Sequence, residues 1–242
     1  MKSKLPINEI FGPTIQGEGL YTGHPVYFIR MAYCDNKCTF CDTQKAWNKV
    51  NAEMSPDEIV SKLDASISNV VVITGGNPCI HDLSDLIDEL HANKFVVHIE
   101  TQGTVAPKWL QDIEAISISP KAPSSGSYTE LYKLMTVLDK VAAKHIWKAI
   151  KVVVDIDNEE DWKYVNDIAM LFPEVDIDIG RIPLIIQVKD DMTKDFNLED
   201  YANTYKKTVE KYLDKVKKGK IRGGIRILPQ MHKIIWNRKE GV

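Results

Sequence analysis

Three of the four cysteines in this 242-residue chain fall within eight residues, at Cys34, Cys38 and Cys41. A loop with this spacing can supply three thiolates to one compact centre, such as a [4Fe–4S] cluster that keeps one iron open for a small molecule. The alternative is a zinc site completed by a histidine, although closed zinc sites prefer a fourth ligand nearby. His24 lies ten residues before the first of these cysteines, and Cys79 lies 38 residues after the last. The spacing therefore favours the cluster and leaves the zinc site open.

Composition and charge exclude several other classes of protein. The chain is 44% hydrophobic and 27% charged, with 13 glycines and 11 prolines, which excludes disordered and collagen-like sequences. Thirty-one basic against 34 acidic residues give a net charge of −3, so we expect no direct binding of nucleic acid. The longest aliphatic run, residues 70–73, is far shorter than the ~20 residues of a membrane span. We expect a cytoplasmic protein with reduced thiols and no contact with a membrane.

Short β-rich apolar runs alternate with amphipathic segments along most of the chain. The apolar runs are residues 26–31, 70–74, 95–100, 115–119, 149–155, 182–188 and 224–228. The helix-like segments are residues 56–67, 82–93, 107–112, 128–146, 157–172 and 198–218. This alternation predicts parallel βαβ units in an α/β fold, a partial or distorted (β/α) barrel of about six parallel strands. An open doubly wound sheet is the alternative. Because no linker interrupts the pattern, we expect a single domain over residues 1–242.

Polar motifs follow four of the predicted strands. They are residues 34–41, 74–78, 100–103 and 119–121. Because binding sites in parallel α/β folds gather at the carboxyl ends of strands, we expect these motifs to lie on one rim of the sheet.

The cysteine pattern, with Phe40 directly before the last cysteine, resembles the signature of the radical S-adenosylmethionine (SAM) enzymes. The resemblance implies a partial or full β/α barrel and a [4Fe–4S] cluster held by Cys34, Cys38 and Cys41. It also implies that the open iron binds SAM, and that an electron from the cluster cleaves SAM to a 5′-deoxyadenosyl radical. A flavodoxin or ferredoxin is the implied electron donor.

The segment Thr74-Gly75-Gly76-Asn77-Pro78 resembles the Gly-Gly-Glu-Pro motif of that superfamily, which meets the amino group of SAM. Two glycines allow the close approach of a ligand, although an ordinary strand-to-helix turn has the same composition. Asn77 replaces the glutamate and brings no charge. The SAM-binding residues implied by the resemblance are Phe40, Asp42, Gly75, Gly76, Ser119, Pro120, Lys121 and Gln187. For Gln187, a plain strand residue is an equal alternative.

Residues 9–19, Glu-Ile-Phe-Gly-Pro-Thr-Ile-Gln-Gly-Glu-Gly, narrow the resemblance to the 7-carboxy-7-deazaguanine synthases, ring-contracting enzymes of queuosine and deazapurine biosynthesis. Further matches are Arg30 and residues 41–43, 100–103 and 228–233. The family reaction implies conversion of 6-carboxy-5,6,7,8-tetrahydropterin to 7-carboxy-7-deazaguanine with loss of ammonia. It starts with hydrogen abstraction at C6, regenerates SAM and needs no catalytic side chain beyond the SAM-derived radical.

The same resemblance implies a substrate site, a magnesium ion and a homodimer. The implied substrate-binding residues are Ile15, Gln16, Gly17, Glu18, Arg30, Thr74, Gln230 and His232, the first four of them in an N-terminal substrate-binding extension. Gln16 and Glu18 suit the donors and acceptors of a pterin edge, and the planar guanidinium of Arg30 suits its carboxylate. Thr43 is the implied protein contact of Mg²⁺, which prefers oxygen ligands.

Two alternatives in function stay open on the sequence alone. Another radical SAM enzyme, such as a glycyl-radical activase, would share the cysteine spacing, and a non-enzymatic zinc-binding module would share the clustered thiols. Purely structural roles are also open for three of these residues: Arg30 in a surface ion pair, Thr43 as a helix cap and His232 as a packed side chain. Cys79 is predicted to be a buried, inert thiol.

Overall fold

The computed structural model describes residues 3–143, 145–171, 182–239 and 241. Its strands form one sheet in the order β3-β1-β2-β4-β5-β6-β7-β8-β9. The strands are β1 (Leu5–Ile15), β2 (Pro25–Met31), β3 (Ala52–Met54), β4 (Val70–Gly75), β5 (Val96–Thr101), β6 (Ala115–Ile118), β7 (Trp147–Val154), β8 (Leu184–Val188) and β9 (Arg226–Leu228). β2 and β4 to β9 all run parallel, whereas β1 is antiparallel to β2 and β3 is antiparallel to β1.

The strand order confirms the predicted partial barrel and excludes the doubly wound alternative. From β2 to β9 the parallel strands follow chain order without a reversal, whereas a doubly wound sheet reverses at a switch point. β3 and β9 are the two ends of the sheet, so it does not close within the described residues. All seven predicted apolar runs are parallel strands, one more than the about six that we expected.

The sequence pattern did not predict β1 or β3. β1 contains Pro6 and Pro13, which interrupt the apolar alternation, and its register with β2 shifts twice, once between Ile7 and Glu9 and once between Phe11 and Thr14. Because β1 is antiparallel and extends the sheet beyond the βαβ units, the repeat that predicted the other strands does not include it.

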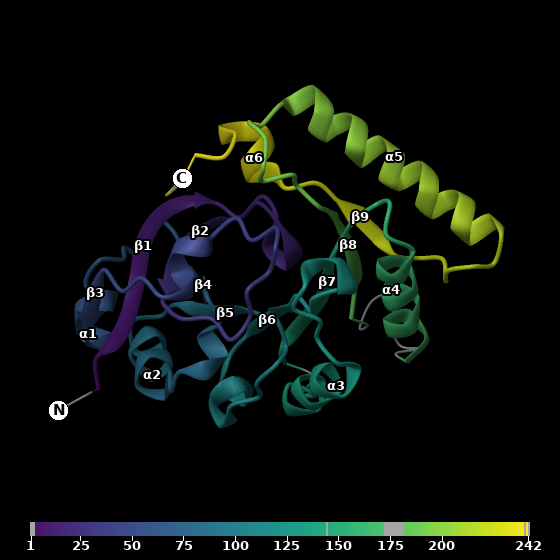
Figure 1. Ribbon diagram of the computed structural model, residues 1–242. Coiled ribbons are helices and arrows are strands. Elements are labelled where there is room, and N and C mark those ends of the chain that lie inside the picture. Colours follow the sequence, from purple (N-terminus) through teal and green to yellow (C-terminus); the bar gives the residue numbers. More distant parts are fainter. Residues whose placement is uncertain (1–2, 144, 172–181, 240, 242) are drawn as a thin grey trace.

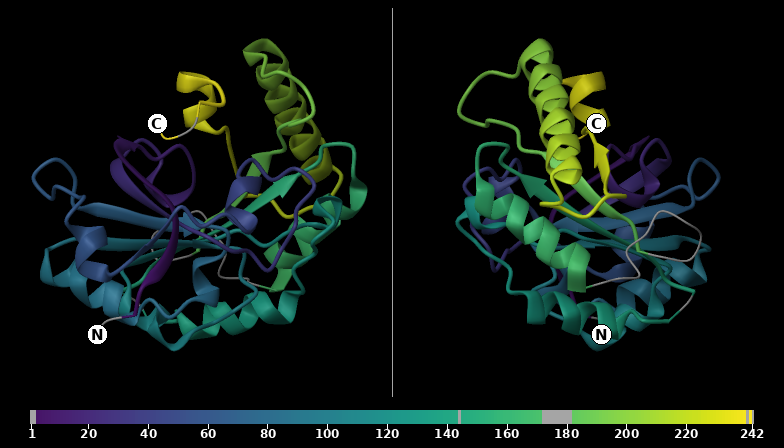
Figure 2. Two further views of the ribbon diagram at one scale, coloured as in Figure 1. Left: turned by 60° about the vertical axis from the view of Figure 1, so that its left-hand side comes forward. Right: turned by 90° about the vertical axis from the view of Figure 1, so that its right-hand side faces the viewer.

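Six α-helices accompany the described part of the sheet (Figure 1). They are α1 (Pro56–Val60), α2 (Ser84–Ala92), α3 (Leu131–Lys140), α4 (Glu159–Leu171), α5 (Leu198–Lys217) and α6 (Met231–Trp236). α6 was not predicted, the segment 56–67 is α-helical only to Val60, and residues 108–112 form a short 3-10 helix. The end of the predicted segment 157–172 lies outside the described residues. Figure 2 shows α2 and α3 along one side of the sheet, with α5 and α6 on the other.

The hydrophobic core lies between the sheet and the first four helices. Ile99 of β5, Ile116 of β6 and Ile150 of β7 are buried there against α2 to α4. Because successive side chains of a strand point to opposite faces, their neighbours point to the other, concave face of the sheet. Glu100 and Lys151 are among those neighbours. The period-two pattern of the strands therefore separates an apolar core from a polar face.

We find no helix in the described residues that is both long enough and apolar enough to cross a bilayer.

Candidate functional site

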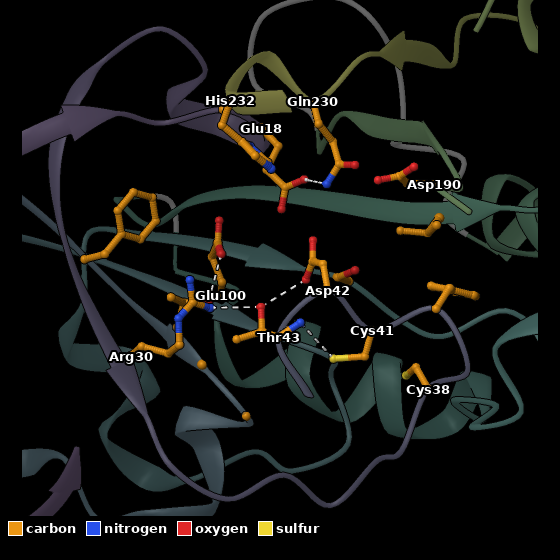
Figure 3. A pocket seen from close by; sticks show the side chains of 18 of the residues that line it. Glu18, Arg30, Cys38, Cys41, Asp42, Thr43, Glu100, Asp190, Gln230 and His232 are labelled. Atoms are coloured by element: carbon orange, nitrogen blue, oxygen red, sulfur yellow. Dashed lines mark hydrogen bonds between the residues drawn. The ribbon is translucent and has the colours of Figure 1, made fainter. Parts of the chain in front are cut away.

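A cavity of about 370 Å³ lies between the concave face of the sheet, the loop of residues 34–41 and the segment that contains α6. Figure 3 shows this cavity, with Glu18, Gln230 and His232 on one side and the cysteine loop on the other. Eighteen of the predicted site residues line it: Ile15, Gln16, Gly17, Glu18, Arg30, Cys34, Cys38, Phe40, Cys41, Asp42, Thr43, Thr74, Gly75, Gly76, Ser119, Lys121, Gln230 and His232. Pro120 and Gln187 are not part of its wall.

The three clustered cysteines are free thiols at the edge of this cavity. Cys38 is buried, and the other two are half-buried. The backbone N–H of Thr43 donates to the Sγ of Cys41 at 3.4 Å, and that of Asn36 donates to the Sγ of Cys34 at the same distance. Burial raises the pKa of all three thiols, that of Cys41 to about 11. Ionisation of these thiols is therefore favoured only where a positive charge, such as a metal centre, lies close by.

The geometry does not favour the zinc alternative. A tetrahedral zinc site with Zn–S bonds of 2.3 Å holds its sulfurs within about 4 Å of each other. Across the described ranges, no three His, Cys, Asp or Glu side chains are arranged to hold one ion. Three cysteines that line one cavity without such an arrangement suit a polynuclear cluster better than a single ion.

Lys121 lies half-buried beside the cysteine loop. Its Nζ donates to the backbone oxygen of Ser119 at 2.8 Å and to Oγ of the same residue at 3.0 Å. Burial lowers the pKa of Lys121, while the charge of Cys38 acts in the opposite direction. The segment after β6 therefore presents a cation and two hydroxyl or carbonyl oxygens to the thiol side of the cavity.

Glu18 is the centre of the opposite wall. Its carboxylate accepts hydrogen bonds from Lys151, from Gln187 and from the Nε2 of Gln230, the last at 3.1 Å. Burial alone would raise the pKa of Glu18, but the charge and hydrogen bond of Lys151 outweigh it and hold this pKa well below its usual value. Glu18 is therefore an anion with a fixed orientation. Gln187 lies behind it and contacts the cavity only through it.

Glu100 is a site residue that the sequence reasoning did not select, although its motif was noted on the predicted rim. Its carboxylate accepts from Nε2 of Gln16 at 2.9 Å and from Oγ1 of Thr74 at 3.0 Å. Burial, joined by the negative charge of Glu18, raises the pKa of Glu100. Burial acts to lower the pKa of Lys151, but the negative charges of Glu18 and Glu100 outweigh it and raise this pKa. For Glu100 and Lys151 alike, the indication in the sequence was a charged residue within a largely apolar strand.

Arg30 carries its guanidinium into the cavity wall rather than onto the outer surface. Its Nε donates to Oε1 of Glu9 at 2.7 Å, and its Nη1 donates to Oγ1 of Thr43 at 3.3 Å. Oε2 of Glu9 also meets Nζ of Lys45 at 3.1 Å. Thr43 donates in turn to Oδ1 of Asp42 at 3.0 Å. Glu9, which was not selected as a site residue, thus fixes the orientation of Arg30.

The C-terminal segment closes the cavity against the turn between β1 and β2. The backbone N–H of Met231 donates to the oxygen of Gly17 at 2.9 Å. A Cβ at Gly17 would come within 2.1 Å of the ring of His232, so only glycine allows this approach. Burial lowers the pKa of His232, and the charge of Glu18 partly offsets this effect.

Asp190, after β8, anchors this C-terminal segment with two cations. It meets Nζ of Lys233 at 2.8 Å and the Nη2 of Arg238 at 2.7 Å. The Lys233 side chain is almost completely buried. Asp190 accepts a second bond from the Nε of Arg238 at 3.0 Å, so this pair is bidentate. Lys233 lies in the matching segment 228–233, but no spacing in the sequence links it to Asp190 or Arg238.

Comparisons with known proteins agree with this architecture. Residues 28–182 match the model of the radical SAM superfamily. The 7-carboxy-7-deazaguanine synthase of Bacillus cereus is 37% identical, over 99% of this chain and 100% of that protein. The Bacillus subtilis enzyme of the same name is 34% identical over the full length of both. The crystal structure of QueE from Escherichia coli superposes with a TM-score of 0.65 at 26% identity, covering 95% of each chain. The chain therefore belongs to the radical SAM superfamily and, within it, to the family of the 7-carboxy-7-deazaguanine synthases.

Proposed function

We propose that this protein is a radical SAM carbon–nitrogen lyase that converts 6-carboxy-5,6,7,8-tetrahydropterin to 7-carboxy-7-deazaguanine with loss of ammonia. One observation carries the proposal beyond the names of the relatives. A three-cysteine loop and a wall of hydrogen-bonding side chains, Gln16, Glu18, Gln230 and His232, face each other across the same cavity. A cofactor on one side and a polar heterocycle on the other would place their reacting atoms together.

The cofactors of the radical SAM family fit the thiol side of this cavity. A [4Fe–4S] cluster and SAM, when bound, supply the 5′-deoxyadenosyl radical that takes hydrogen from C6 of the substrate. Cys34, Cys38 and Cys41 would hold the cluster, because all three are free thiols in the cavity wall and backbone N–H groups donate to Cys34 and Cys41. The segment that contains α6 forms the opposite wall of the site through Gln230 and His232.

For SAM, we propose the backbone of Gly75 and Gly76 together with Phe40, Asp42, Ser119 and Lys121. A Cβ at Gly76 would meet the backbone oxygen of Tyr33 at 1.8 Å, so the glycine lets β4 and the cysteine loop approach closely. Pro120 would shape the segment between Ser119 and Lys121 without contacting the ligand. We assign Gln187 to the support of Glu18 and no longer to SAM, because its Nε2 donates to Glu18.

For the pterin, we propose that Arg30 binds the carboxylate and that Glu18 and its neighbours bind the ring edge. Glu9 accepts from Nε of Arg30 and Thr43 accepts from its Nη1, which leaves Nη2 of the guanidinium for the substrate carboxylate. Glu18 accepts from the amino and ring N–H groups of the pterin, since it is held as an anion. The stacked rings of Phe11 and Phe28, 4.9 Å apart at their centroids, form an apolar part of the wall.

The remaining substrate contacts proposed are Ile15, Gly17 and Thr74, which line the same side of the cavity. The residues that precede β2 would then serve as a substrate-binding extension of the barrel. We also propose a homodimer, and a flavodoxin or ferredoxin as the electron donor, both on the strength of the family resemblance.

Mg²⁺ is a further proposal. The Oγ1 of Thr43 lies in the cavity wall 3.0 Å from a carboxylate oxygen of Asp42, so two hard oxygen ligands are already adjacent. Substrate oxygens and waters would complete six-fold coordination. The positive charge of the ion would hold the substrate carboxylate in place together with Arg30.

An anaerobic assay tests the proposed function. Protein reconstituted with iron and sulfide is mixed with SAM, Mg²⁺, a reductant and the carboxytetrahydropterin, and the product is identified by mass spectrometry. We expect 7-carboxy-7-deazaguanine, and none from a tetrahydropterin that lacks the carboxylate. If protein with a full cluster cleaves SAM but leaves the pterin unchanged, the assignment is wrong. A glycyl-radical activase would give that result. A zinc-binding module would give a colourless protein.

A further inference from the structure

Asn77 follows β4 at the place where the superfamily motif has glutamate, and it is completely buried. Its Oδ1 accepts from Oγ1 of Thr101 at 2.9 Å and from the backbone N–H of Cys79 at 3.2 Å. Its Nδ2 donates to Oδ1 of Asp35 at 2.9 Å and to Oγ1 of Thr104 at 3.1 Å. A carboxamide has two donor hydrogens and two acceptor lone pairs. All four are used within the protein, so this side chain has nothing left to offer SAM.

Asp35, the acceptor of the Asn77 amide, lies in the cysteine loop directly after Cys34. Its Oδ1 also accepts from Nε2 of Gln102, and its Oδ2 accepts from the hydroxyl of Thr104. Nε2 of Gln102 lies 3.5 Å from the sulfur of Cys34 as a second donor contact. The network therefore ties the first cysteine of the loop to the carboxyl ends of β4 and β5.

A carboxylate at position 77 would not fit this network. It would lose both N–H donors, leaving Asp35 and Thr104 without them, and would place a second negative charge at hydrogen-bond distance from Asp35. A carboxylate at this distance cannot donate to another carboxylate. Positions 35 and 77 are therefore coupled: with aspartate at one, the side chain at the other must donate the hydrogen bond.

We propose that Asn77 and Asp35 are a pair of positioning residues, in which the amide at position 77 donates to the carboxyl group at position 35. The pair holds the first turn of the cysteine loop, and through it Cys34, in the position that the cluster requires. This inference rests on the cysteine loop being the cluster site of the proposed function. It does not depend on which substrate the enzyme takes.

A size-matched charge swap tests the pair. The variants are Asn77→Asp, Asp35→Asn and the double variant with both changes, and Asn203→Asp on the exposed face of α5 is the control for an added carboxylate. In cluster-free protein, we expect Asn77→Asp to accelerate amide hydrogen exchange in residues 33–42 at least tenfold. The double variant should return it to within twofold of the wild type, because the new amide at position 35 can donate to the new carboxylate. The control should leave exchange in this loop unchanged.

Two further measurements separate positioning from simple packing. After reconstitution, bound iron should fall by more than half in Asn77→Asp and recover in the double variant. The change that SAM causes in the electron paramagnetic resonance spectrum of the reduced cluster should be lost and recovered in the same way. If the double variant is as impaired as Asn77→Asp, or if Asn77→Asp behaves as wild type, the pair has no positioning role. An Asn77→Asp chain that fails to fold while the double variant folds supports the coupling.

These readouts do not involve the pterin. If wild-type protein with a full cluster forms no deazaguanine, the proposed function is refuted, but the hydrogen-exchange results on the pair are not affected. Conversely, an active enzyme whose double variant shows no rescue would refute only the pair.

Discussion

Replacing Lys151 with methionine should make the protein less stable as the pH rises above 4.5. In the wild type, Lys151 is 8% exposed and contacts Glu18, which is 18% exposed. Burial acts to raise the pKa of Glu18, yet the charge of Lys151 holds it below its ordinary value of 4.5. A carboxyl with a depressed folded pKa contributes stability that is present above 4.5 and is lost only as the pH falls toward the folded value.

Without Lys151 the burial remains and the compensating charge is gone, so the folded pKa of Glu18 rises above its unfolded value. Between those two values the folded protein keeps a proton that the unfolded chain has released. The free energy of unfolding then falls with pH by about 1.4 kcal/mol per unit, or roughly 2 kcal/mol over one and a half units. At neutral pH the total loss of stability approaches the cost of breaking a buried ion pair, which is about 3–5 kcal/mol.

The matched control is Lys151→Met combined with Glu18→Gln. The second change removes the stranded charge and keeps a side chain that can bond to Gln187 and Gln230. We expect this double variant to be more stable than Lys151→Met by about 2 kcal/mol at pH 7.5 and equally stable near pH 4.5. Glu100 and His98 are present in both variants, so the difference between the variants reports the charge of Glu18, including its effect on Glu100.

Urea unfolding of cluster-free protein, followed by the fluorescence of its five tryptophans, measures these differences at pH values from 4.5 to 7.5. The difference in midpoint between the two variants should widen steadily with pH. Parallel pH profiles for the two variants would show that Lys151 does not keep Glu18 ionised, and the description of this wall of the site would be wrong.

Three further changes have expected outcomes. His98 is buried with its pKa lowered to about 3, so below its ordinary 6.5 the wild type should lose about 1.4 kcal/mol of stability per pH unit, and His98→Gln should flatten that slope in urea titrations. Cys79→Ala should bind the same amount of iron as wild type, because burial raises the pKa of this thiol to about 12 and it faces the core, and should lower stability by only about 1 kcal/mol. Asp190→Asn should raise the KM for the pterin about tenfold, a loss of ~1.4 kcal/mol, and leave SAM binding unchanged in equilibrium titrations, because Asp190 anchors the segment that carries Gln230 and His232.

Much of the fold could be predicted because parallel strands buried on both faces read as short apolar runs. Val70 to Ile73 of β4 are all buried, and that run was the clearest strand signal in the sequence. β1 has no such signal, since prolines and two register shifts break its alternation. α6 is six residues long and carries His232, so its local pattern is too short to indicate a helix.

The residues of the candidate site also differ in whether the sequence could predict them. Residues in contiguous motifs, such as the cysteine loop, could be selected because their spacing already defines a ligand set. Glu100 and Lys151 could not be selected by spacing, because each is a charged residue within a largely apolar strand, and its role depends on what faces it across the sheet. Asp190 has its partners 43 and 48 residues further on, and no local pattern links them.

The position of Glu18 connects folding with the chemistry of the site. Its carboxylate bonds to Lys151, 133 residues away, and to Gln230, 212 residues away. Contacts at such separations form only after long loops have closed, so this wall of the cavity is complete only when β7 and the C-terminal segment are both in place. A partly folded chain would carry the cysteine loop and its neighbouring strands but lack an ordered anion for the pterin. Correct binding of the heterocycle therefore requires the whole sheet, whereas the thiol side of the cavity requires the strands only as far as β6 and the segment that follows it.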